Sequence, residues 1–133
     1  MHAELQRRCN TIEEAYEFML AYAAQGASGD ASSQSGGQIR DFLTRAADAL
    51  TGLGDLYASV VERESLEPSR YRPFGAVLDR DARDSLAAID LVLAQPAISS
   101  QIVDNLNASI HVRALLTDLF LVDEIFKVRL KPV

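Results

Sequence analysis

The spacing of apolar residues predicts helices along most of the chain. Apolar side chains recur every three or four positions over residues 3–25, 38–64 and about 79–95, a period that places them on one face of a helix. Between these segments, residues 26–37 are mostly glycine and serine, and residues 67–77 hold two prolines and a glycine. Both intervening segments are predicted to be loops, and we expect the first of them to be mobile.

The last apolar segment, residues 97–130, changes its apolar face partway along. Its first half has one apolar stripe with a spacing of four residues, formed by Ile98, Ile102, Leu106 and Ile110. Beyond His111 the apolar residues instead cover most of the other sides of the predicted helix. We therefore expect a long carboxy-terminal helix that either breaks near His111 or passes there from one packing environment into another.

These patterns predict an all-α protein, a single domain over residues 1–133 folded as a bundle of four to five helices. Residues 38–64 have a wide apolar face with an acidic stripe outside it, which is typical of a bundle helix. Gly52 and Gly54 weaken this helix locally and would permit a close helix crossing. Residues 126–130 alternate with period two, so a short terminal strand is a second interpretation of that end.

Composition narrows the function classes. The formal net charge is −6, which disfavours nucleic-acid binding because the phosphate backbone is held largely by Lys and Arg. The single cysteine, Cys9, has no internal disulfide partner and lies on an apolar stripe, so a buried structural thiol is expected. We find no signal-peptide pattern, and Asp118 and Asp123 interrupt the best membrane-span candidate. We expect a cytoplasmic protein without membrane contact.

The carboxy-terminal segment supplies the main functional hypothesis. A helix that is apolar on nearly all sides is stable only if most of those sides are shielded from water. In a small domain, a second chain is the simplest way to bury them. We therefore predict a homodimer or higher oligomer through residues 112–126, with a possible protein partner. The function that this favours is a non-catalytic accessory or protein-interaction module without a cofactor. The predicted interface residues are Leu115, Leu119, Val122 and Phe126, with Arg113 or Glu124 at the rim.

Two acidic motifs support an alternative hypothesis. The first is Ile12-Glu13-Glu14-Ala15-Tyr16-Glu17, and the second is Leu53-Gly54-Asp55-Leu56-Tyr57. Carboxylates spaced three and four residues apart share a helix face and suit Mg²⁺, which prefers oxygen ligands. These residues resemble motifs of the all-α MazG-type nucleoside triphosphate pyrophosphohydrolases. The resemblance implies a Mg²⁺-dependent hydrolase with Glu13, Glu14, Glu17 and Asp55 at the metal.

The second motif departs from the family pattern, because residues 51–53 are Thr, Gly and Leu where the family has a glutamate just before Gly-Asp. The first motif is also explained as favourable negative charge in the early turns of a helix. A di-iron site is not expected, since no Glu-x-x-His pair accompanies either His2 or His111. A third hypothesis is a small-ligand sensor with a cavity in the bundle.

Overall fold

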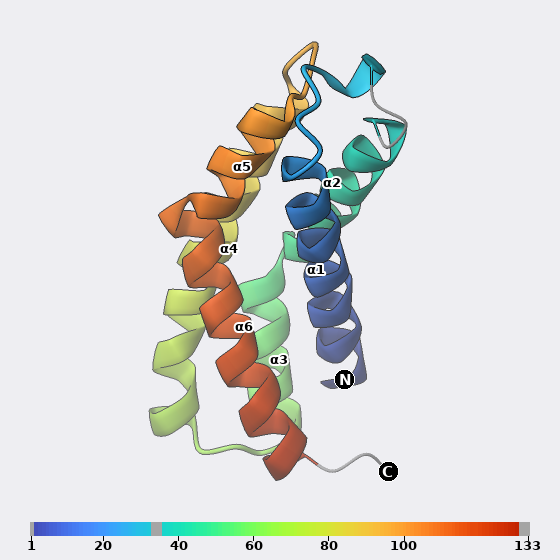
Figure 1. The fold of residues 1–133 in the computed structure, drawn as a ribbon. Coiled ribbons are helices and arrows are strands. Elements are labelled where there is room, and N and C mark those ends of the chain that lie inside the picture. Colours follow the sequence, from blue (N-terminus) through green and yellow to red (C-terminus); the bar gives the residue numbers. More distant parts are fainter. Residues whose placement is uncertain (1, 33–35, 131–133) are drawn as a thin grey trace.

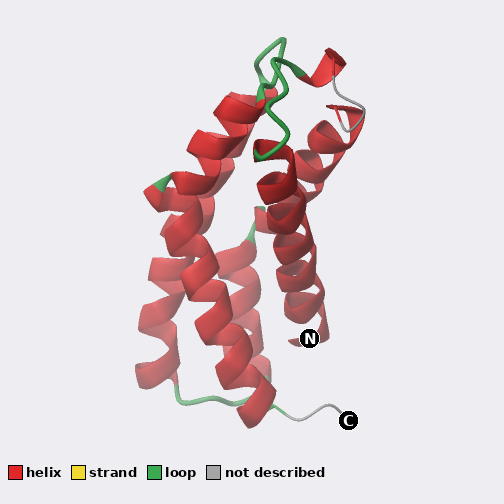
Figure 2. Cartoon of the chain, in the orientation of Figure 1, coloured by secondary structure: helices red, strands yellow, loops and turns green. Residues whose placement is uncertain are grey.

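The computed structural model describes residues 2–32 and 36–130, and within them all regular secondary structure is helical, with turns and short loops between the helices (Figures 1 and 2). A short 3₁₀ turn, η1 (Asp30–Ser32), follows the first helix. The described α-helices are α1 (His2–Ala23), α2 (Gly36–Leu50), α3 (Leu53–Arg63), α4 (Pro68–Leu93), α5 (Ser100–Ala108) and α6 (Ile110–Arg129). The predicted all-α class is confirmed, but there are six helices in these residues rather than four or five.

The predicted helix over residues 38–64 is two helices, α2 and α3, separated at Gly52. Gly52 has a left-handed backbone with φ of +71°, a conformation that glycine adopts without steric cost. Gly54, two residues later, lies against α4, where an added Cβ would be 2.5 Å from the Cβ of Asp79. The expected close crossing is therefore confirmed at Gly54, and the single continuous helix was wrong.

The carboxy-terminal segment also breaks, at Ser109, two residues before the predicted position. Ser109 is extended (φ −62°, ψ 145°), and its hydroxyl accepts a hydrogen bond from the amide of Val112 at 3.3 Å. A serine in this position caps the first free amides of a helix. The helix α6 then continues to Arg129, so the alternative of a terminal strand is not what the structure shows.

The helix α4 begins at Pro68, inside the segment predicted to be a loop. Proline suits the first turn of a helix, where its missing N–H would have no helical partner. Pro73 removes one helical hydrogen bond, but its neighbours Tyr71 and Phe74 pack against the core. The loop prediction for residues 67–77 was wrong because this apolar contact outweighs the local cost of proline and Gly75.

The long helices α1 and α4 organise the bundle (Figure 1). The helix α1 packs mainly against α2 and α5, while α3 and α6 pack mainly against α4, which also contacts α2. At the seam between α1 and α2, the rings of Phe18 and Phe42 stack with centroids 4.5 Å apart. Among the side chains that are completely buried in the resulting core are Tyr22, Ile39, Leu43, Leu78 and Leu119.

The connector after α1 has defined contacts over its described part, whereas residues 33–35 lie outside the described residues. The carboxylate of Asp30 accepts hydrogen bonds from Arg40 Nε at 2.5 Å and from the amide of Ile98 at 2.7 Å. The same guanidinium donates to the carbonyls of Leu93 and Gln95 at the end of α4. Composition alone did not predict these contacts, because the Gly- and Ser-rich sequence contains only one charged residue.

Candidate functional site on the outer face of α6 and the α4–α6 cleft

The four apolar residues predicted to form an interface lie inside the core of the chain itself. Leu115, Leu119, Val122 and Phe126 are each no more than 6% exposed. They face α4, α3 and α1, which cover this side of α6. The two predicted rim residues, Arg113 and Glu124, are exposed. A surface for self-association on α6 must therefore be formed by the side chains that this helix does expose.

The helix α6 exposes an unusual amount of apolar surface. Eight large apolar side chains are exposed within residues 2–32 and 36–130, and five of them belong to α6: Ile110, Phe120, Leu121, Ile125 and Val128. Val128 is 69% exposed and Phe120 is 55% exposed. An exposed apolar patch of this kind on a protein surface often marks an interaction site.

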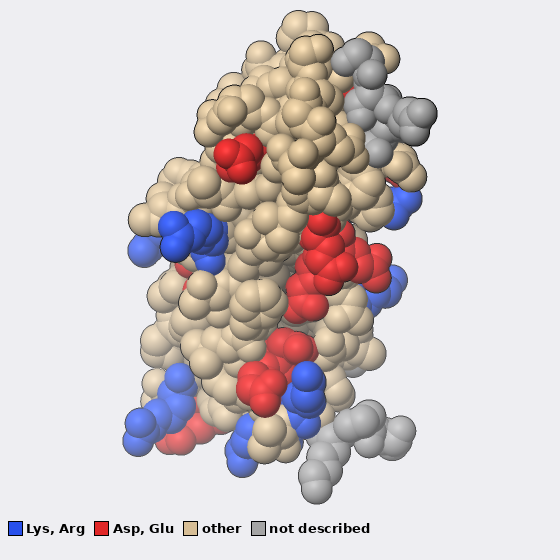
Figure 3. Space-filling model, in the orientation of Figure 1, with Lys and Arg blue, Asp and Glu red and all other residues tan. Residues whose placement is uncertain are grey.

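Most of these residues share one continuous side of the helix with the two rim residues. At 100° per residue, the arc that they occupy is about 100° wide. We call this arc the α6 outer face, and its members are Ile110, Arg113, Thr117, Phe120, Leu121, Glu124 and Val128. Figure 3 shows an uncharged surface over the middle of α6, between a cationic group near its beginning and charged groups near its end.

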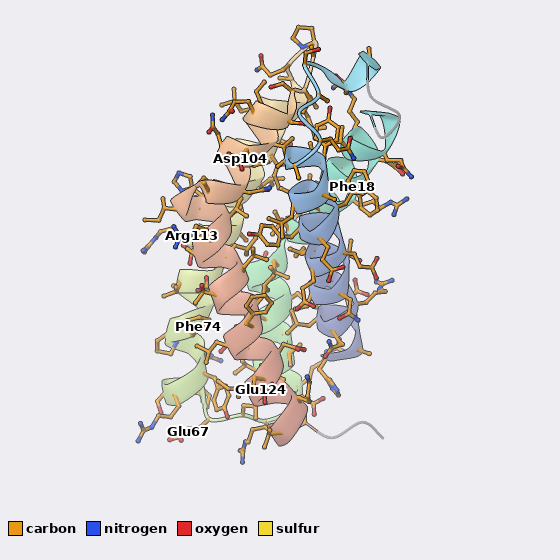
Figure 4. The ribbon with its side chains drawn as sticks, viewed as in Figure 1. Phe18, Glu67, Phe74, Asp104, Arg113 and Glu124 are labelled. Atoms are coloured by element: carbon orange, nitrogen blue, oxygen red, sulfur yellow. The ribbon has the colours of Figure 1, made fainter. Side chains whose placement is uncertain are left out.

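Arg113 and Glu124 are placed symmetrically on the α6 outer face. They are eleven residues apart, which turns the helix through three full turns and about 20° more, so both point to nearly the same side. Figure 4 shows Arg113 near the beginning of α6 and Glu124 closer to its end. Glu124 has a weak local partner in Lys127, with 4.0 Å between their charged atoms. Arg113 has no ion pair within the described part of the chain.

The acidic residues of the alternative hypothesis are not brought together. Glu13, Glu14 and Glu17 lie on α1, and Asp55 is exposed in the first turn of α3. Among the described residues, no three His, Cys, Asp or Glu side chains are placed to share a metal ion. Figure 3 shows acidic side chains gathered between α1 and α6. Partial burial there raises the pKa of Glu13, and the nearby Asp123 of α6 raises it further.

A buried carboxyl group, Asp118, was not anticipated as a functional residue. It lies on the core side of α6 among leucines and valines, and one of its oxygens has no hydrogen-bond partner in the described structure. Burial raises the pKa of Asp118 to about 7, and the neighbouring Asp81 of α4 adds to the rise. Two adjacent carboxyl groups attract each other only when a proton lies between them. The helical position of Asp118, three residues after Leu115 and four before Val122, was the signal available in the sequence.

Cys9 is a buried structural thiol, as expected. It is 1% exposed in the core beside α6, and burial raises its pKa to about 12. A thiol that stays protonated is a poor nucleophile. The residue therefore offers no reactive centre in the folded protein.

A cleft of about 500 Å³ opens beside the α6 outer face, between the first half of α4 and the second half of α6. Its apolar lining comes from three helices and includes Tyr57, Tyr71, Phe74, Leu121, Ile125 and Phe126. Figure 4 shows Phe74 and Glu67 on the α4 side of this region. No sequence pattern indicates the cleft, because its residues come from positions 57 to 129 and meet only in the fold.

Comparisons of the chain with protein families, with curated proteins and with solved structures found no match. Within the described residues, no helix combines the length and the apolar character needed to cross a bilayer.

Proposed function

We propose that the protein is a non-catalytic interaction module that forms a homodimer through the α6 outer face. The observation that carries this proposal is the concentration of exposed apolar side chains on one helix, five of the eight in the described chain. Covering such a surface removes apolar area from water, which is the main favourable term in association. The occupant that fits best is a second copy of the same chain, because the charges on this face are self-complementary.

The self-complementarity follows from an antiparallel pairing of two α6 helices. A two-fold axis midway between Arg113 and Glu124 places each arginine opposite the glutamate of the other copy, about 8 Å along the helix on either side of the axis. The same axis places Phe120 against Thr117 of the other copy, since these two residues have the same midpoint. One helix face thereby makes two Arg113–Glu124 ion pairs and two contacts between Phe120 and Thr117.

The expected affinity is moderate. The helix α6 is about 30 Å long, and one helix pair of this length covers less than the roughly 800 Å² per partner that a stable interface of standard size contributes. We therefore expect a dissociation constant in the micromolar range, so that dimer formation depends on protein concentration.

A charge-reversal experiment tests this interface. Sedimentation equilibrium up to about 100 µM is compared for the wild type, Arg113→Glu, Glu124→Arg and the double variant. Each single reversal places two like-charged pairs across the axis and should give monomers, whereas the double variant restores opposite charges and should dimerise again. Arg80→Glu, at an exposed position on α4, changes the net charge by the same amount as Arg113→Glu, so it is the matched control for that variant and should leave the dimer intact.

Phe120→Glu provides a second, independent test of the same face. It should abolish the dimer while preserving the helical circular dichroism signal, because Phe120 is 55% exposed and does not belong to the buried core. A wild type that stays monomeric over the whole concentration range would overturn the proposal. A dimer that survives both single charge reversals and Phe120→Glu would place the interface elsewhere.

A further inference from the structure

The cleft beside α6 has the dimensions of a ligand site. Its volume of about 500 Å³ falls within the range of pockets that bind small organic molecules, roughly 300 to 1,000 Å³. One wall is formed by Glu67 and by α4 as far as Phe74, and the other is α6 from Leu121 to Arg129. The second wall is about 12 Å long, which matches an extended alkyl chain of about ten carbons.

The floor of the cleft is aromatic and held in place. The ring of Tyr57 stacks on Phe126 with centroids 5.8 Å apart and 9° between planes, and it meets Phe74 edge-on at 6.4 Å. The Tyr57 hydroxyl donates to the carbonyl of Tyr71 at 2.7 Å, so its polar atom is already satisfied. Gly75 permits this arrangement, because a Cβ there would lie 3.3 Å from the Tyr57 ring. The floor therefore offers apolar contact without hydrogen bonds to a ligand.

The rim of the cleft is positively charged in a protein whose net charge is −6. Arg70 of α4 and Arg129 of α6 both line the opening. Neither has an ion-pair partner or a side-chain hydrogen bond within the described residues. Glu67 is the one carboxylate in the lining, and it accepts a hydrogen bond from the Ser69 hydroxyl at 3.2 Å. Two guanidinium groups without partners beside an apolar floor suit a carboxylate, which arginine can bind through two parallel hydrogen bonds.

We propose that the α4–α6 cleft binds a medium-chain fatty carboxylate. The alkyl chain lies over Tyr57, Phe74 and Phe126, beneath the partly exposed Leu121 and Ile125, and the carboxylate is held by Arg70 and Arg129. This site is separate from the proposed dimer contact, since Arg113, Phe120 and Glu124 are not part of the cleft lining. Leu121 is the one residue that borders both surfaces.

Isothermal titration calorimetry with decanoate tests the proposal, with decyltrimethylammonium as a ligand of equal chain length and opposite charge. Decanoate should bind one per chain, and the cationic ligand should bind at least about tenfold more weakly. Shortening the acid to octanoate should weaken binding about fourfold per methylene removed. The double variant Arg70→Gln with Arg129→Gln should lose at least about tenfold in affinity for decanoate.

Two further variants separate the site from general effects. Arg72→Gln removes an exposed arginine of α4 that does not line the cleft, and it should bind decanoate as the wild type does. Ile125→Glu places a negative charge in the lining and should abolish binding, with melting temperatures checked for each variant. The monomeric Arg113→Glu variant should still bind decanoate, so failure of the dimer and failure of this site are distinguishable.

The proposal is overturned by any of three results. Wild-type protein that shows no decanoate binding up to about 1 mM would remove the site. Equal binding of decanoate and decyltrimethylammonium would show that the arginines do not select the head group. Undiminished decanoate binding by the double arginine variant would place the ligand elsewhere.

Discussion

Ser65 adopts a left-handed backbone conformation, with φ of 54°, just after α3. Its amide bonds to the carbonyl of Glu62, and the next amide, of Leu66, bonds to the carbonyl of Val61 at 3.0 Å. This pair of hydrogen bonds is the Schellman arrangement, in which glycine normally occupies the left-handed position. The chain therefore carries a small conformational cost at Ser65, which the burial of Leu66 offsets.

Replacing Ser65 with glycine should stabilise the protein. Glycine adopts the left-handed conformation without strain, so we expect Ser65→Gly to raise the free energy of unfolding by about 0.5 to 1 kcal/mol. Urea denaturation followed by circular dichroism measures the change. Ser59→Gly, in the interior of α3, is the matched control and should instead destabilise by a similar amount. Equal destabilisation by both changes would contradict this account of Ser65.

The buried carboxyl of Asp118 makes stability depend on pH near neutrality. Its pKa of about 7 in the folded protein lies above its ordinary value of 3.8, so the folded state binds the extra proton between about pH 4 and 7. Stability is therefore expected to fall as pH rises through that window, because the carboxylate must then be charged in the core beside Asp81. Below about pH 4 both states are protonated and the effect disappears.

Asp118→Asn should remove this dependence. The amide is neutral at every pH, so the variant should be more stable than the wild type above about pH 7, and its unfolding free energy should change less between pH 4 and 7. Urea denaturation at several pH values measures this. Asp84→Asn, at an exposed position on α4, serves as the control and should follow the wild-type profile. A wild-type stability that rises steadily from pH 4 to 8 would argue against a buried Asp118 that keeps its proton in the folded state.

The sequence pattern of α6 does not indicate which of its apolar residues are buried. On α6, Leu119 is buried whereas its neighbours Phe120 and Leu121 are exposed, although all three are strongly apolar. A helix that is apolar on most sides contains no signal that selects the inward side, because the choice depends on where α4 and α1 lie. The sequence thus indicated the apolar excess of α6 correctly, but it placed the interface on the side that the fold buries.

At the scale of elements, helical periodicity identified the helical segments, while their boundaries depended on tertiary contacts. The breaks at Gly52 and Ser109 follow from local chemistry, a left-handed glycine and a serine cap. A break near the second position was one of the two alternatives predicted from the change of apolar face. The start of α4 was not anticipated, because Pro68, Pro73 and Gly75 are ordinarily loop residues. Packing of Tyr71 and Phe74 against the core, including their contacts with Tyr57 of α3, decides the outcome there.

Asp30 links the connector after α1 to Arg40 of α2 and to the chain between α4 and α5. Hydrogen bonds from Arg40 and from the Ile98 amide lower the pKa of Asp30 to about 2. Because this pKa is below the ordinary value of 3.8, the carboxylate contributes stability above about pH 4 that is lost as pH falls toward 2. The side chain is 14% exposed, so water screens the interaction less than at a surface ion pair.

Asp30→Asn should lower the free energy of unfolding at pH 7 by about 1 to 3 kcal/mol, since a charge-assisted hydrogen bond to Arg40 is lost. The difference from wild type should shrink as the pH is lowered below 4. Thermal and urea denaturation between pH 2 and 7 measure both effects. Asp41→Asn breaks the exposed pair with Arg45 and should cost well under 1 kcal/mol. If the two variants lose equal stability, Asp30 is not the anchor that its contacts indicate.

At the scale of the whole molecule, both proposed sites belong to the same part of the bundle. The α6 outer face and the α4–α6 cleft are formed by α6 and its neighbours α3 and α4, while α1, α2 and α5 contribute to neither. The net charge of −6 does not reveal the cationic rim of the cleft, because only two residues form that rim. Both proposed sites therefore depend on how helices distant in sequence are brought together, which composition could not predict.

The two helix breaks have a consequence for how the molecule opens. Gly54 lies against Asp79 of α4, and the Ser85 hydroxyl donates to the carbonyl of His111 at 2.9 Å, so both breaks meet α4 within about 9 Å along its axis. Only α4 runs without a break from the region of α3, α6 and its own first half into the rest of the molecule. The helix α1 belongs to the rest of the molecule and contacts both α3 and α6. We expect the amides of α3, α6 and the first half of α4 to exchange with solvent hydrogen as one cooperative unit, at lower free energy than those of α1, α2 and α5. Both binding surfaces would then be lost together in a partially unfolded state in which the other half of the protein stays folded.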